Sequence, residues 1–256
     1  MASSSTKTMI LYDLLQKTPG AGCWSPMVWR TRLLLNYKGI PYTTVWLKNN
    51  EIAKTLSAVG IPSNPQQAPG TIGPQPLAYT VPAVKFPDGS AVMDSAAIAL
   101  KIEARYPQPK IDLAPELQAK VMPLYGQILF QLAGTFFPLI RRNILLEESI
   151  AEWTANKETT FGRSMAEMEA NSGEAAWRNA EPGFEKLREL LRESKKDAGP
   201  FVLGGEVCYV DFIFGAMMEC CRKVGGDLYA NFARYAPELR EIHEACEGKG
   251  WLEKDD

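Results

Sequence analysis

A serine before a proline, at a predicted helix start, is the first residue in this chain whose position could support chemistry. Proline suits the first turn of a helix, where its missing N–H is not needed, so Ser25 before Pro26 is predicted to be the N-cap. Its hydroxyl then has two possible uses. It caps free backbone donors, worth about 1 kcal/mol, or it faces a ligand near the positive end of the helix dipole. For an isolated Ser-Pro pair, capping is the more frequent use.

A second candidate site lies at the end of a predicted hairpin. Apolar runs at 83–86 and 91–93 flank the turn residues 87–90, and a helix is predicted to follow. Asp94 and Ser95 stand at the start of that helix. A carboxylate and a hydroxyl beside free backbone donors can hold the amine and the carboxylate of an amino-acid zwitterion. The pattern therefore predicts a peptide or amino-acid site.

The entry to the hairpin is Val81-Pro82. If this bond is cis, Val81 can direct its backbone N–H and C=O towards a peptide ligand instead of a neighbouring strand. If it is trans, the pair is an ordinary edge-strand entry, which is the more frequent state of an X–Pro bond. The spacing leaves both alternatives open.

Together these segments resemble the glutathione-binding half of the thioredoxin-like domain in glutathione transferases. In that family the residue before a cis-proline pairs with the cysteinyl backbone of glutathione, and an acidic residue followed by Ser holds its γ-glutamyl end. The resemblance implies that Val81, Pro82, Asp94 and Ser95 bind glutathione. A basic or amide side chain usually binds the glycine carboxylate, so Lys48 and Lys54 are candidates, although solvated lysines are an equally good interpretation.

The resemblance also gives Ser25 a role. Its position in the family contacts the sulfur of glutathione, and a hydroxyl that donates to the thiolate favours ionisation of a thiol whose ordinary pKa is about 8.5. Omega-type transferases and glutaredoxins have Cys directly before this proline and perform disulfide exchange. Here that residue is Ser, with Cys23 two positions upstream, which favours thiolate activation. The motif Trp-Ser-Pro-x-x-Trp-Arg-x-Arg resembles serine-containing fungal transferases related to bacterial glutathione-dependent β-aryl etherases.

The elements that position these residues divide the chain in two. Short β-like runs at 9–12 and 42–47, a helix at 25–37 and the hairpin precede residue 108, and the pattern is nearly all helical after it. We expect an α/β, thioredoxin-like domain at 1–107 and an all-α bundle at 108–256. In the resembled fold, the irregular segment 61–77 is expected to replace the short second helix.

In the helical half, long helices are predicted at 116–146 and 148–171. An aromatic cluster on the first is either core or, as the resemblance implies, a wall of the hydrophobic-substrate pocket; the predicted pocket residues are Trp24, Phe130, Phe136, Phe137 and Ile140. Later in the chain, the resembled fold has a Ser or Thr that caps a buried helix together with an Asp three residues on. Here the cap position is Cys208, a poor acceptor, so Asp211 is expected to carry most of the capping.

Composition excludes several classes of function. The 256 residues carry a net charge of −2 and no dense basic block, so neither nucleic acid nor an anionic membrane is an implied partner. No secretory signal or apolar run long enough to span a membrane is found, which predicts a cytoplasmic protein. The five cysteines lack metal-ligand spacing, which predicts reduced thiols and no metal site.

The sequence thus predicts a glutathione transferase in which Ser25 activates the thiolate for attack on a hydrophobic aromatic electrophile. The resemblance also implies a homodimer. One alternative is a ligandin, which binds aromatic or phenolic compounds with little turnover. Another is glutathione-dependent cleavage of β-aryl ethers, which needs the same thiolate.

Overall fold

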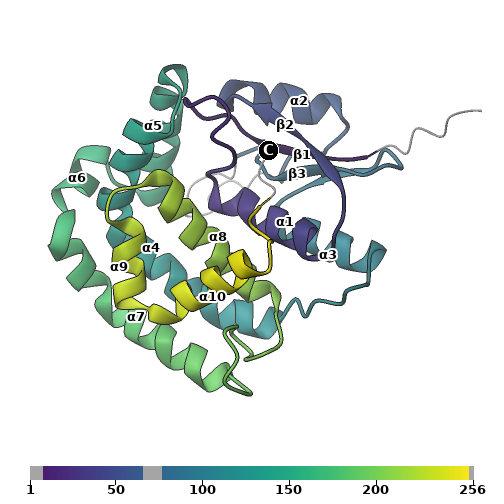
Figure 1. Cartoon of the computed structure of the whole chain (residues 1–256). Helices are drawn as coiled ribbons and strands as arrows, with labels where there is room; N and C mark the ends of the chain where they lie inside the picture. The colour runs from purple at the N-terminus through teal and green to yellow at the C-terminus, as the bar shows by residue number, and fades with distance from the viewer. Residues whose placement is uncertain (1–7, 66–76, 254–256) are drawn as a thin grey trace, which may run out of the picture.

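The structure is a computed structural model that describes residues 8–65 and 77–253. Within these residues a four-stranded sheet with flanking helices is followed by a bundle of helices, which lies to one side of the sheet in Figure 1. The fold is therefore the predicted one, a thioredoxin-like α/β domain followed by an all-α domain.

The sheet has the strand order β2-β1-β3-β4 and is mixed. Parallel β1 and β2 are joined through α1, whereas β3 is antiparallel to both β1 and β4. In Figure 1, α1 and α3 lie on one side of the sheet and α2 on the other. The elements of this domain are β1 (Met9–Leu14), α1 (Pro26–Tyr37), β2 (Tyr42–Leu47), the 3-10 turn η1 (Asn49–Glu51), α2 (Ile52–Ala58), β3 (Ala83–Lys85), β4 (Ala91–Met93) and α3 (Ser95–Arg105).

The predicted strands, hairpin and first helix are confirmed, but the expected loss of the second helix is wrong. Helix α2 is present at Ile52–Ala58, before the irregular segment 61–77. It is short, and Leu56 is its only buried residue, so it presents almost no hydrophobic periodicity in the sequence. Residues 66–76 of the irregular segment lie outside the described residues.

The helical domain is built on α4, which runs from Pro115 to Asn143 with prolines inside it. Its buried face packs against α7, α6 and α8, and α1 of the first domain also packs on α8. One continuous core consequently joins the two domains. The other helices are α5 (Glu147–Phe161), α6 (Met165–Ala170), α7 (Gly173–Ser194), α8 (Tyr209–Val224), α9 (Leu228–Tyr235) and α10 (Pro237–Gly248).

The second long helix predicted at 148–171 is in fact two helices, α5 and α6. Gly162 ends α5 in the left-handed conformation, with φ of 63°, which favours glycine because it lacks a Cβ. Ser164 then caps α6 with Glu167 in a reciprocal capping box. A helix stop directly followed by a helix start therefore divides the segment in two.

Helix α8 is the buried centre of the second domain, and its start depends on Asp211 as predicted. The Asp211 carboxylate accepts the backbone N–H of Cys208 at 2.8 Å and that of Val202 at 2.7 Å. Burial raises the pKa of Asp211 to about 6, although these hydrogen bonds lower it. The carboxylate therefore fixes both the helix start and the loop before it.

Candidate active site

The strand register brings the predicted glutathione contacts to one edge of the sheet. Tyr12 of β1 pairs with Ala83 of β3, which in turn pairs with Met93 of β4. These three paired residues form a row across the sheet. Three segments lie within a few residues of the row and must therefore be side by side: the end of β1, the segment before β3 and the residue after β4. Val81 and Asp94 flank this row at that edge.

The Val81-Pro82 bond is cis. The β3 ladder begins only at Ala83, so Val81 lies outside the strand pairing. The Pro82 carbonyl accepts the backbone N–H of Asp94 at 3.2 Å. This contact joins the entry of the hairpin to its exit, and so places Val81 next to the start of α3.

Asp94 is the N-cap of α3, with φ of 77°. Its Oδ1 atom accepts the backbone N–H of Ala96 at 2.9 Å and that of Ala97 at 3.0 Å. Ser95 is the first residue of the helix and is 4% exposed, and its carbonyl accepts the hydroxyl of Tyr209 from α8 at 3.0 Å. Two sets of hydrogen bonds thus fix the start of α3: the capping bonds of Asp94 and the bond from Tyr209 of the helical domain.

Ser25 is the N-cap residue of α1, as predicted, but its hydroxyl makes no capping hydrogen bond. The residue is 6% exposed and has extended backbone angles. The capping alternative is therefore not how this side chain is used. Its hydroxyl stands at the N-terminal end of a twelve-residue helix, where the dipole favours a negative charge.

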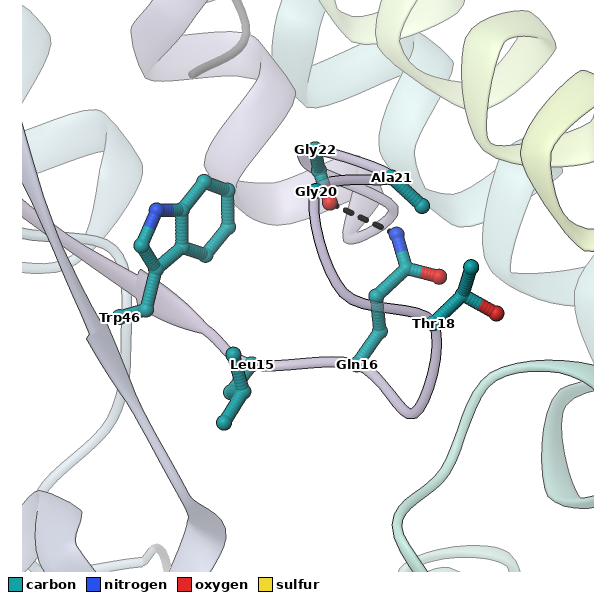
Figure 2. Close-up of a pocket in the computed structure, with 7 residues that line it drawn as sticks. All are labelled: Leu15, Gln16, Thr18, Gly20, Ala21, Gly22 and Trp46. Carbon is teal, nitrogen blue, oxygen red and sulfur yellow. Dashed lines mark hydrogen bonds between the residues drawn. The ribbon is translucent and has the colours of Figure 1, made fainter.

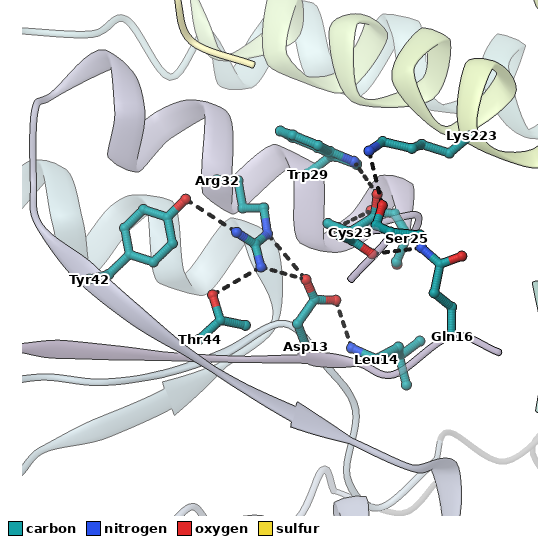
Figure 3. Close-up of polar contacts among 12 residues, drawn as sticks. Asp13, Leu14, Gln16, Cys23, Ser25, Trp29, Arg32, Tyr42, Thr44 and Lys223 are labelled. Atoms are coloured by element: carbon teal, nitrogen blue, oxygen red, sulfur yellow. Dashed lines mark hydrogen bonds and ion pairs between the residues drawn. The ribbon is translucent and has the colours of Figure 1, made fainter. Parts of the chain in front are cut away.

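Three hydrogen bonds fix the loop that carries Ser25 (Figure 3). Gln16 Nε2 donates to the Gly22 carbonyl at 2.7 Å, and Trp29 Nε1 donates to the Cys23 carbonyl at 3.1 Å. Lys223 Nζ, from α8, donates to the Ala21 carbonyl at 3.1 Å. The loop is consequently held by its own side chains and by the second domain.

The second domain holds the beginning of the loop as well. The backbone N–H of Lys17 donates to the Ile144 carbonyl at 2.9 Å, and Lys17 Nζ donates to the Arg142 carbonyl. Both acceptors lie at the end of α4. The loop therefore bridges the two domains along its length.

A buried ion pair lies between the two elements that this loop connects (Figure 3). Arg32 of α1 donates through Nε and Nη2 to Asp13 Oδ2, at 3.1 and 2.9 Å, and both side chains are fully buried. Its guanidinium also donates to Thr44 Oγ1 at 3.0 Å and to the Tyr42 hydroxyl at 3.3 Å. Since Asp13 lies on β1 and Arg32 on α1, the pair clamps the two elements that the loop connects.

Cys23 lies in the loop but is fully buried, and its Sγ atom is 3.7 Å from the Ser25 carbonyl. Burial raises the pKa of the Cys23 thiol well above its ordinary value, and the nearby Asp13 charge raises it further. A neutral, inaccessible thiol is a poor participant in disulfide exchange. The environment of Cys23 thus agrees with the preference for thiolate activation over exchange.

A cavity of about 200 Å³ opens beside this loop (Figure 2). Its lining comes from Leu15 and Gln16, from the loop residues Thr18, Gly20, Ala21 and Gly22, and from Trp46 of β2. None of the predicted pocket residues lines it. The sequence gives no indication of Trp46 as a lining residue, because an isolated aromatic residue in a strand gives no sign of a cavity.

The predicted aromatic pocket residues do not share one wall. Phe136 packs on Phe232 of α9, with ring centroids 6.4 Å apart, and so belongs to the core of the helical domain. Phe137 packs against Trp153 and Phe161, at 5.3 and 5.0 Å. Phe137 thus points towards α5, away from the α9 side of the helix.

The other predicted pocket residues are also distributed. Phe130 is 42% exposed and stacks on Phe161, while Trp24 and Ile140 are each 5% exposed. The Nε1 atom of Trp24 is buried and has no hydrogen-bond partner among residues 8–65 and 77–253. Trp24 directly precedes Ser25 and is the predicted pocket residue nearest to it in the chain.

The two lysines proposed for the glycine carboxylate differ. Lys48 Nζ is 2.9 Å from Glu148 Oε1 of α5, and the two side chains are 41% and 49% exposed. Hydrogen bonding to Glu148, together with its charge, raises the pKa of Lys48. Lys54 lies on α2 and is exposed.

None of the helices among residues 8–65 and 77–253 is long and apolar enough to cross a membrane. The same residues contain no cluster of three or more His, Cys, Asp or Glu side chains that could hold a metal ion.

The fold is that of a two-domain protein in which a thioredoxin-like domain is followed by a helical domain. The family model for the glutathione S-transferase N-terminal domain matches residues 24–105, and that for the C-terminal domain matches residues 124–235. The chain belongs to the glutathione S-transferase family.

Relatives with known names or structures agree with this assignment. A glutathione S-transferase-like protein, ustS, of Aspergillus flavus is 26% identical over 90% of this chain and 86% of its own length. A glutathione S-transferase of Ceriporiopsis subvermispora, solved in complex with glutathione, covers 94% of this chain and 97% of its own at 22% identity, with a TM-score of 0.77. A glutathione transferase of Phanerochaete chrysosporium covers 96% and 98% at 22% identity, with a TM-score of 0.73.

Proposed function

We propose that this transferase binds glutathione along the edge formed by Val81, Pro82, Asp94 and Ser95, and that Ser25 stabilises its thiolate. The thiolate then attacks a hydrophobic aromatic electrophile, with Lys48 or Lys54 facing the glycine carboxylate. The observation that carries the proposal is the position of the Ser25 hydroxyl at the N-terminus of α1, where it makes no capping hydrogen bond. A hydroxyl that does not cap its own helix is available to donate to a sulfur anion.

The chemistry follows from two effects on the thiol. A hydrogen bond donated to the thiolate favours the charged form, and so does the positive end of a helix dipole. Both lower the pKa of a thiol whose ordinary value is about 8.5. A larger fraction of the bound glutathione is then nucleophilic at neutral pH, because the thiolate is the reactive form.

The test is a pH titration of thiolate absorbance in bound glutathione, for the parent protein and for Ser25→Ala. The proposal predicts a bound-thiol pKa well below the free value in the parent and a normal one in Ser25→Ala, with binding retained. Ser172→Ala is the matched control, because Ser172 is also a helix N-cap whose side chain makes no capping bond. That control should titrate like the parent.

Two other outcomes separate the alternatives. If glutathione binds but its thiol titrates normally in the parent, Ser25 does not activate it, and a ligandin role becomes the better explanation. Release of a phenol from a model aryl ether, without turnover of a chloronitroaromatic electrophile, would instead identify β-aryl ether cleavage.

The proposal includes a cytoplasmic homodimer, as the family resemblance implies. Size-exclusion chromatography with light scattering would then give about twice the chain mass of 28.4 kDa. A mass equal to that of one chain at micromolar concentration would contradict the dimer and leave the proposed chemistry unchanged.

A further inference from the structure

Three consecutive carbonyl groups, those of residues 21–23, precede Ser25 in its loop, and each accepts a hydrogen bond from a side chain (Figure 3). The donors come from three different parts of the fold: Gln16 after β1, Trp29 on α1 and Lys223 on α8. Trp29 differs from the other two donors because it belongs to the helix whose N-cap is Ser25. Its hydrogen bond therefore fixes the loop relative to that helix.

Trp29 holds the chain on both sides of position 24. Its indole Nε1 atom donates to the carbonyl of Cys23 at 3.1 Å, and its backbone N–H donates to the carbonyl of Ser25 at 2.9 Å. Trp29 and Cys23 are both fully buried. A close-packed indole has little freedom to move, because side chains in a protein core occupy well-defined rotamers. The backbone from 23 to 25 is consequently held to α1 by one rigid side chain and one backbone hydrogen bond.

This placement matters because a hydrogen bond to a sulfur anion depends on the position of its donor. Groups that act on a reacting atom must be held close to their productive geometry, and a displacement of about 1 Å costs a large part of their effect. Without the indole N–H, the buried carbonyl of Cys23 would lose its partner, which is unfavourable. The peptide between 23 and 24 would then turn towards another donor, and Ser25 would move with it.

We infer that Trp29 is a positioning residue for Ser25: its indole N–H, through the carbonyl of Cys23, fixes the direction of the Ser25 hydroxyl. The inference rests on the proposed function, because it takes the sulfur of glutathione as the partner of that hydroxyl. Because Trp29 is fully buried, it acts on the thiolate only through the backbone of residues 23–25.

The test is the pH titration of thiolate absorbance in bound glutathione, extended to Trp29→Phe, Ser25→Ala and the double variant. Trp29→Phe keeps an aromatic ring and removes the indole N–H. A hydrogen bond to a charged group changes an equilibrium by about 10- to 100-fold, and we expect its misplacement to lose about tenfold. The pKa of the bound thiol should therefore rise by about 1 in Trp29→Phe. In the Ser25→Ala background, Trp29→Phe should cause no further rise, because a positioning residue has no effect once the group that it positions is absent.

Two further proteins separate the lost hydrogen bond from lost packing. Trp177→Phe is the matched control, because Trp177 is 3% exposed and packs against three aromatic rings of the helical domain. It should lower the melting temperature but leave the pKa of the bound thiol as in the parent. If Trp29→Phe does not fold, 3-benzothienylalanine introduced at position 29 keeps the bicyclic ring and removes only the donor. That protein should raise the pKa of the bound thiol by the same amount.

The outcomes for the inference and for the proposed function are distinct. If Ser25→Ala raises the pKa of the bound thiol and Trp29→Phe does not, the inference is overturned while the proposed function stands. A rise of equal size with and without the Ser25 hydroxyl would also overturn the inference, because Trp29 would then act independently of Ser25. If Ser25→Ala titrates like the parent, the proposed function fails and the inference fails with it.

Discussion

The buried pair of Asp13 and Arg32 makes a sharp quantitative prediction. Both side chains have no exposed surface, and they share hydrogen bonds of 2.9 and 3.1 Å. Removal of one partner leaves an unpaired buried charge, which costs about 3–5 kcal/mol of unfolding free energy. Arg32→Met or Asp13→Leu alone should thus lower the melting temperature by about 6–20 °C, taking about 2–4 °C per kcal/mol for a chain of this size.

The double variant should behave differently from the sum of the two changes. When both charges are replaced by apolar groups of similar volume, the desolvation cost disappears together with the attraction, so stability should return close to that of the parent. Differential scanning calorimetry of the four proteins measures this coupling. Additive losses in the double variant would refute the reasoning, because they would show that packing and not charge compensation holds β1 to α1.

An exposed pair provides the control for these measurements. Lys196 and Glu206 are 3.2 Å apart, but their side chains are 62% and 76% exposed. Lys196→Met should change the unfolding free energy by less than about 1 kcal/mol, because water and salt screen an exposed pair. The effect of Arg32→Met should also persist in high salt, since a buried pair is screened much less.

Three further predictions concern other parts of the structure. Burial raises the pKa of Asp211 to about 6, so the protonated carboxyl group contributes to the free energy of unfolding; this contribution is fully present below the ordinary pKa of 3.8 and is lost as pH rises through 6. In urea unfolding, the parent should therefore lose about 3 kcal/mol between pH 4 and pH 7, whereas Asp211→Asn should not show this loss. Gly134→Ala would place a Cβ 1.8 Å from a backbone oxygen of α6 and should cost about 3 kcal/mol, whereas Gly126→Ala, with open space around it, should stabilise by up to about 1 kcal/mol in the same assay. Lys48→Met should weaken glutathione binding about tenfold in calorimetry if it holds the glycine carboxylate; unchanged affinity would transfer that role to Lys54.

Local patterns were sufficient to predict the fold. The alternation and turn residues of 83–93 define the hairpin, and Pro26 and Asp94 mark helix starts that the structure contains. Helix α2 was missed because a short, exposed helix with one buried residue has almost no periodicity to detect. The break between α5 and α6 was missed because Gly162 is only one residue in a run that otherwise favours a helix.

The sequence was sufficient to place Ser25 and Asp94 at helix starts, whereas their roles towards glutathione belong to the proposed function. Contacts made across the domain interface leave no local trace. The burial of Arg30, which is 5% exposed, is one example, because its guanidinium lies 5.9 Å from the ring of Tyr125 on the distant helix α4. The aromatic residues of α4 could not be assigned to a pocket for the same reason, since adjacent Phe136 and Phe137 point towards different helices.

The loop that carries Ser25 is fastened to the helical domain by Lys223 at one end and through the Ile144 carbonyl at the other. The helical domain and the loop of Ser25 are therefore not separable parts of this chain. An exchange of the helical domain for that of another transferase would remove both anchors and release the loop. Under the proposed function, a new substrate pocket would then have to come with these two backbone anchors or with a replacement for them.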